Sequence, residues 1–112
     1  MDTSIDFLHA ALNGLMTRQS VIADNIANAS TPDFQARQVD FETALRQAMN
    51  ASSAPPMDPA VVSPTNAPSK QDGNNVNLDA ETMTLSETEM RYQAVVNAIN
   101  GKFSVLKTAI EG

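Results

Sequence analysis

The stretch VIADNIANASTPDF, residues 21 to 34, combines the end of an amphipathic helix with a proline turn. Upstream of it, apolar residues recur at alternating spacings of three and four. The ring of Pro32 pushes Thr31 out of the helical region, so a helix that begins near the N-terminus must end by Thr31. The stretch therefore closes a predicted helix of about 25 residues, roughly 38 Å long at 1.5 Å per residue.

The apolar residues of this helix form a heptad stripe, which packs along a partner helix with a left-handed twist. Gln19 is its only polar occupant. We call the stripe the N-terminal seam, and its members are Ile5, Leu8, Leu12, Leu15, Ile22 and Ile26.

A second heptad series runs from about Leu78 to Ile110 and predicts another long helix. Gly101 costs about 1 kcal/mol relative to alanine in a helix interior. It marks either a close helix approach or a tolerated glycine, and both readings stay open. We call the series the C-terminal seam, and its members are Leu85, Tyr92, Val96, Ile99, Phe103, Leu106 and Ile110.

Between the seams, apolar residues from Phe41 to Met49 predict a short helix, with Asp40 placed as its N-cap. Residues 51–77 hold most of the prolines and show no apolar periodicity, so we expect them to be mobile or ordered only by partners. The predicted fold is all-α, with the long terminal helices packed as a coiled-coil-like pair. Its segments are an N-terminal helix and turn (1–34), a short helical arm (35–50), a flexible Pro-rich linker (51–77) and a C-terminal helix (78–112).

Charge and composition exclude several classes of function. A formal net charge of -6 with only 7 Lys and Arg argues against nucleic-acid partners, which need a concentrated basic face. No apolar run approaches the roughly 18 residues that span a bilayer, so we expect no direct membrane insertion. Early acids at the N-terminus, with no apolar block after them, predict that no secretory signal is cleaved.

The chain offers little for chemistry. It has 1 histidine and 0 cysteines, and His9 lies off the N-terminal seam, where a solvated role is expected. The stretch DGNNVN, residues 72–77, only superficially matches a calcium loop, because Val76 stands where an oxygen ligand belongs. We therefore predict no enzyme, no catalytic residue, no cofactor and no metal.

The two long seams carry more apolar surface than one helix pair can bury. The residues thus predict an interaction protein whose terminal helices pair with each other and with other copies or partners. In isolation such a chain is expected to be marginally ordered.

The stretch ADNIANASTPDF resembles the N-terminal signature of bacterial flagellar axial proteins, the rod and hook family. That signature reads as a helix ending in A-N-N-I-A-N, two variable residues and T-P-G-Y. Asp24, Asp33 and Phe34 depart from it, and Asp33 affects only the type of turn. The matching residues are Ala23, Asn25, Ile26, Ala27, Asn28, Thr31 and Pro32.

Asn25 and Asn28 are interpreted first as capping the C-terminus of the helix. The alternative is hydrogen bonding across subunit contacts. Within the family, ARQVDF (36–41) and the block from Asp72 to Leu106 resemble subunits of the proximal rod, and the two blocks agree in order and spacing.

The resemblance implies a structural subunit of the proximal rod of the flagellar basal body, in the periplasm, within the shaft that transmits torque from motor to hook and filament. It implies synthesis in the cytoplasm, export by the flagellar type III system and folding on assembly. The implied partners are further copies in a helical assembly, rod proteins of the FlgC, FlgF and FlgG types, the adaptor FliE and the export gate. Another axial rod subunit, or a soluble coiled-coil adaptor or chaperone, remains the alternative.

Overall fold

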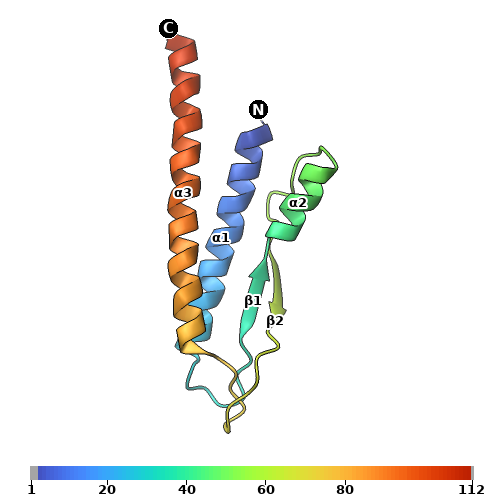
Figure 1. Cartoon of the computed structure of the whole chain (residues 1–112), viewed down its shortest axis with the longest axis vertical. Coiled ribbons are helices and arrows are strands. Elements are labelled where there is room, and N and C mark those ends of the chain that lie inside the picture. The colour runs from blue at the N-terminus through green and yellow to red at the C-terminus, as the bar shows by residue number, and fades with distance from the viewer. Residues whose placement is uncertain (1–2, 112) are drawn as a thin grey trace.

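The computed structural model describes residues 3–111, so residues 1, 2 and 112 of the predicted terminal segments lie outside the described part. The elements, in chain order, are α1 (Thr3–Ala27), β1 (Arg37–Asp40), α2 (Glu42–Asn50), β2 (Val61–Pro64) and α3 (Leu78–Glu111). The molecule is elongated, with extents of 64 × 26 × 15 Å (Figure 1).

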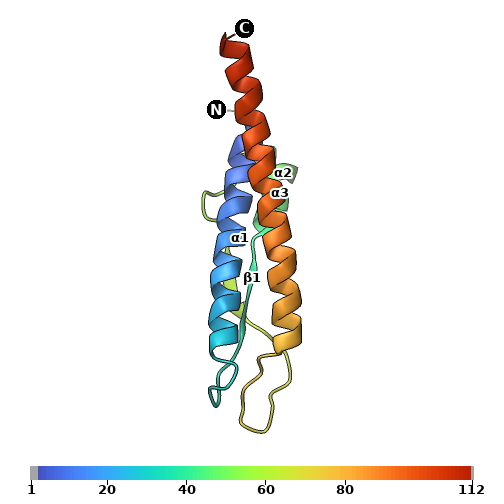
Figure 2. The ribbon, with the colours of Figure 1, turned by 90° about the vertical axis from the view of Figure 1, so that its left-hand side faces the viewer.

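The two long helices run antiparallel along each other and form the most extensive contact between elements (Figures 1 and 2). Both chain ends lie at one end of the molecule, and the turn after α1 lies at the other. Helix α1 ends at Ala27, ahead of Pro32, so the predicted helix end is confirmed. Helix α3 has 34 residues against 25 for α1, and its end runs past the start of α1 (Figure 1). Within residues 3–111, no helix has the length and apolar character needed to cross a membrane.

The fold is mostly helical, and the all-α prediction is wrong in one element. Strands β1 and β2 pair antiparallel in a small ribbon, with Val39 opposite Val62 and Arg37 opposite Pro64. Strand β2 lies inside the Pro-rich segment 51–77, where no regular structure was expected. Each strand has 4 residues, too few for an alternating pattern to stand out in the sequence. The mobility of the rest of that segment stays a prediction.

The ribbon and α2 lie against α1, and the core sits between them. Its buried members are Leu15 and Val21 from α1, Val39 from β1, and Phe41. Phe41 lies directly over Gly14, since a Cβ built there would stand only 2.3 Å from its ring. Asp40 accepts hydrogen bonds from the backbone N–H of Thr43 at 3.1 Å and from its hydroxyl at 2.6 Å. These bonds tie Asp40 to the first turn of α2, but the N-cap position itself falls one residue later, on Phe41, which makes no side-chain cap bond.

Candidate assembly interface

The N-terminal seam lies mostly inside the molecule. Ile5, Leu15 and Ile22 are buried, while Leu8, Leu12 and Ile26 are half-buried. Leu15 belongs to the core cluster against which Tyr92 of the C-terminal seam packs. The structure therefore brings the two seams together, as the predicted helix pair requires.

The C-terminal seam is covered along only part of its length. Ile99 is buried, and Leu85, Tyr92 and Val96 are half-buried. The next three members, which we call the C-terminal ridge, are exposed: Phe103 by 45%, Leu106 by 46% and Ile110 by 83%. They lie on the end of α3 that runs past α1 (Figure 1), so the pair as folded leaves them without a helix to pack on.

The outward face of α3 is also apolar in places. Met83, Met90 and Val105 are 74%, 69% and 70% exposed. Gly101 shares this face at 100° per residue. Among the described residues, no atom lies within 4 Å of the position its Cβ would take. Within this chain, then, Gly101 serves no close helix approach.

Asn25 of the signature is fully buried and ties α1 to strand β1. Its Nδ2 donates to the carbonyl of Arg37 at 2.8 Å, and its Oδ1 accepts the backbone N–H of Arg37 at 3.1 Å. The same Nδ2 donates to Glu81 of α3 at 3.1 Å. The side-chain amide thus makes the two hydrogen bonds that a neighbouring strand would make on the edge of β1 that faces away from β2. This contact corrects the capping interpretation for Asn25.

Asn28 and Thr31 close the helix end. Asn28 Nδ2 donates to the carbonyl of Asp24 at 2.9 Å, which confirms the capping interpretation for Asn28. The Thr31 hydroxyl donates to Asn28 Oδ1 at 3.1 Å. Ile26 and Ala27 complete the last turn of α1, and the exposed Pro32 follows.

Two further asparagines belong to the same cluster and were missed at the sequence level. Asn74 is fully buried, and its Nδ2 donates to the carbonyls of Asn28 and Thr31, each at 2.8 Å. Asn75 accepts the backbone N–H of Ala36 at 2.6 Å. The NN pair beside Gly73 signals a turn, but nothing local indicates that both amides point inward. Together the amides join the turn after α1 to the segment before α3.

The turn after α1 carries Asp33 where the resembled signature has glycine. Asp33 has a φ of 63°, and its backbone N–H donates to the carbonyl of Asp72 at 2.9 Å. Gly73 lies against it with a φ of 81°, and a Cβ there would meet the Asp33 carboxylate at 2.1 Å. Asp33 therefore adopts the left-handed conformation, which glycine adopts most readily. Gly73 is the residue that lets the two segments approach closely, because it has no Cβ.

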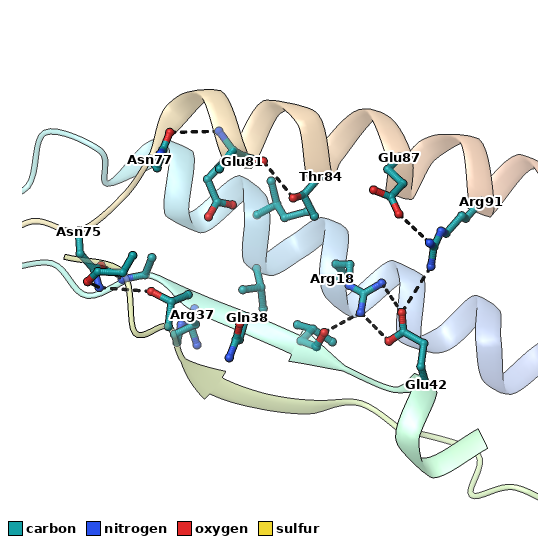
Figure 3. A pocket seen from close by; sticks show the side chains of 17 residues that line it. Arg18, Arg37, Gln38, Glu42, Asn75, Asn77, Glu81, Thr84, Glu87 and Arg91 are labelled. Carbon is teal, nitrogen blue, oxygen red and sulfur yellow. Dashed lines mark hydrogen bonds and ion pairs between the residues drawn. The ribbon is translucent and has the colours of Figure 1, made fainter. Parts of the chain in front are cut away.

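An ionic network also joins the elements (Figure 3). Arg18 of α1 donates to both carboxylate oxygens of Glu42, at 2.7 and 3.0 Å, and to the carbonyl of Val39 at 2.6 Å. Arg91 of α3 reaches Glu42 at 3.5 Å and Glu87 at 2.6 Å. The Glu87–Arg91 pair follows from i, i+4 spacing, but the links to Glu42 span distant segments, so sequence reasoning missed them.

The network lines a polar cleft of about 460 Å³ between the ribbon and α3 (Figure 3). Its arginines are already paired, Arg18 and Arg91 with Glu42, and Arg37 with Asp24 at 2.8 Å. The arginines thus hold the elements together, and their charges are already paired with carboxylates of the same chain. We therefore assign the cleft a structural role.

The network changes the acidity of Glu42. Burial acts to raise the pKa of its carboxyl, but the hydrogen bonds from Arg18 and from the backbone N–H groups of Glu42 and Phe41, together with the charge of Arg18, outweigh burial and lower the pKa below its ordinary value of 4.5. Hydrogen bonds from the hydroxyl and N–H of Thr43 likewise lower the pKa of Asp40 below 3.8.

We expect acid to loosen the link that Glu42 makes between α2 and the helix pair. A carboxyl whose folded pKa is lowered stabilises the fold above its unfolded pKa, and this contribution is lost as pH falls through the folded pKa. The loss should therefore develop below about pH 4.5. The fluorescence of Tyr92, the 1 tyrosine of the chain, reports it because that ring packs on the core. Below pH 4.5, the fluorescence of Glu42→Gln should change less than that of the parent protein, whereas Glu89→Gln should behave like the parent. Identical fluorescence titrations for the parent and both variants would exclude the assignment.

Comparisons of the sequence with known proteins identify the family of this chain. A family model described as "Flagella basal body rod protein" matches residues 5–35, which hold most of α1 and the turn that follows it. The flagellar basal body rod protein FlgB of Bacillus subtilis is 34% identical over 121 residues, covering 97% of this chain and 94% of that protein. FlgB of Escherichia coli is 28% identical, covering 99% and 95%, and FlgB of Salmonella typhimurium is 28% identical, covering 100% and 96%. The resemblance read from residues 21 to 34 thus extends over both long helices and the ribbon between them, and the chain belongs to the FlgB family of flagellar basal-body rod proteins.

Proposed function

We propose that this chain forms part of the proximal rod, within the shaft that transmits torque to the hook and filament, and becomes fully rigid only among neighbouring subunits. Membership of the FlgB family makes it a structural component of the flagellar basal body and not an enzyme. The full-length likeness also favours a rod subunit over a soluble adaptor or chaperone.

The single observation that carries the proposal is the exposed C-terminal ridge. Ile110 is 83% exposed, and burying a side chain of this size contributes about 1.5–3 kcal/mol. Phe103 and Leu106 add further apolar surface to the same helix face. Covering the ridge is therefore a driving force that becomes available only when another surface packs on α3.

The bracing contacts suit a subunit under torsional load. The asparagine cluster links the end of α1 to strand β1, and Glu42 links α2 to both long helices. Sliding of α1 along α3 would have to break the bond from Asn25 to Glu81 and the link from Arg18 through Glu42 to Arg91. We infer that the ribbon and α2 hold the helix pair in register while load passes between subunits.

The partners we propose are further copies of the chain, rod proteins of the FlgC, FlgF and FlgG types, the adaptor FliE and the export gate. We also propose a periplasmic position in the rod and export in an unfolded state. The small core supports this, because only 11 hydrophobic residues among residues 3–111 are buried and a small core resists unfolding weakly.

The proposal is tested by replacing one exposed residue of the ridge. Ile110→Asp should leave the helix content of the isolated chain unchanged, but remove the chain from purified basal bodies and reduce swarming at least tenfold. A charge on the ridge would have to be desolvated when the subunit packs.

Met57→Asp is the matched control, because Met57 is also 83% exposed but lies in the segment after α2. This variant should assemble and swarm normally. Normal swarming by cells that carry Ile110→Asp would rule out the ridge as an assembly surface.

A further inference from the structure

We propose that the C-terminal ridge of one copy docks into an apolar groove between α1 and α2 of a second copy. Each subunit would then offer its ridge to one neighbour and its groove to another. The inference rests on the proposed function, since it takes copies of this chain to be neighbours in the rod.

The groove lies near the start of α1. Phe7, Leu8 and Ala11 of α1 form one wall, Leu45 and Met49 of α2 form the other, and the open space between them is about 550 Å³. Ala11 and Leu45 pack on the core cluster, so the groove continues the contact between α1 and α2 outward. Met49 remains 65% exposed at its edge. As folded, these side chains form an apolar surface that nothing among residues 3–111 fills.

The ridge has the form that such a groove accepts. Phe103, Leu106 and Ile110 follow one another at i, i+3 and i+7, the spacing by which an amphipathic helix fills an apolar groove. The ridge also continues the C-terminal seam directly beyond the buried Ile99. Because the covered part of this seam packs beside α1, its uncovered part fits a surface that α1 also helps to form.

The groove and the ridge of one molecule cannot meet. Helix α1 lies between α3 and α2, and the end of α3 points away past the start of α1 (Figure 1). The ridge must therefore be covered by another molecule. A contact between two different surfaces of identical subunits repeats from copy to copy and builds an open helical array instead of a closed pair.

The required displacement between copies is small. The ends of α1 and α3 that carry Ala27 and Leu78 lie together (Figure 1), so the ridge stands roughly eight residues beyond the level of the groove, or about 12 Å at 1.5 Å per residue. Charge also agrees with the fit. Exposed Arg46 lies on α2 between Leu45 and Met49, and Glu111 follows Ile110 at the end of α3.

Disulfide trapping tests the contact in assembled rods, because the chain has 0 cysteines of its own. A chain that carries both Met49→Cys and Ile110→Cys replaces the parent in cells, and its basal bodies are purified and oxidised. We expect a ladder of cross-linked dimers and higher multimers on a non-reducing gel. Cells that make the two single variants together should yield dimers only, since each chain then has one reactive end. Thr3, which also lines the groove, provides a second pair, Thr3→Cys with Ile110→Cys, because the displacement of eight residues brings these two positions to the same level.

The controls separate this inference from the proposed function. Ile110→Cys combined with Met83→Cys, which is 74% exposed on the outward face of α3, should give monomers. Dimers from Ile110→Cys alone would mean that two α3 helices meet symmetrically, and would overturn the inference. The inference would also be overturned by basal bodies that contain the chain but show no cross-link through either cysteine pair. Neither result would contradict the proposed rod function. Absence of the parent chain from basal bodies would overturn the proposed function and this inference with it.

Discussion

Replacing Asn25 with leucine should detach the ribbon from α1 and abolish motility. The substitution removes the partners of both backbone groups of Arg37 and one hydrogen bond to Glu81. A fully buried polar group left without a partner costs about 1–3 kcal/mol, so the two backbone groups, whose bonds are partly buried, together cost at most about 2–6 kcal/mol. A small domain has a total stability of only about 5–15 kcal/mol. We therefore expect the segment that holds β1 and α2 to detach from α1 even if the two long helices remain folded.

The change is measured by amide hydrogen exchange of residues 36–40 in the isolated chain, together with swarming of the corresponding cells. Exchange in this segment should accelerate at least tenfold. Asn97→Leu is the control, because Asn97 is exposed on α3 and its side chain bonds only with Gln93 among the contacts found. Unchanged protection of the Arg37 amide in the Asn25→Leu protein would show that the side chain does not hold the ribbon.

Two glycine-to-alanine substitutions should have opposite effects on stability. In Gly14→Ala, the new Cβ would lie 2.3 to 2.7 Å from carbon atoms of Phe41, closer than any real contact. Overpacking of this kind typically costs about 1–3 kcal/mol, which exceeds the gain in helix propensity. In Gly101→Ala, the Cβ enters open space, so the gain of up to about 1 kcal/mol should appear undiminished.

Thermal unfolding followed by circular dichroism measures both changes. Adding Phe41→Leu should recover part of the loss in Gly14→Ala, because a smaller side chain leaves room above residue 14. If the two glycine variants shift the melting temperature in the same direction, the close packing of Phe41 on α1 is not present in solution.

The helices could be predicted because their signals are local. Pro32 prevents a helix from continuing through Thr31, its immediate neighbour, and α1 ends within that limit at Ala27. Asp40 supports the first turn of α2 through bonds to Thr43, three residues away. The apolar spacing of each seam is set by the helix itself, which explains why both long helices were found near their observed bounds.

The ribbon and the polar contacts could not be predicted because their causes lie far apart in the chain. Alternate residues of a strand direct their backbone groups to opposite edges, so Arg37 and Val39 turn theirs away from β2. Asn25 and Arg18 of α1 supply the hydrogen-bond partners for the backbone groups on this edge of β1. A four-residue strand has little intrinsic stability, and its existence depends on side chains more than ten positions upstream.

The sequence by itself determined the two long helices, their ends and the family to which the chain belongs, since periodicity, proline sterics and signature residues are all properties of adjacent positions. Only the tertiary structure decided which apolar residues are covered. Ile5 and Ile110 occupy equivalent heptad positions in their seams, yet Ile5 is 1% exposed and Ile110 is 83% exposed. The difference arises because the helices run antiparallel and differ in length, so burial depends on how far one partner extends along the other, which no local pattern records.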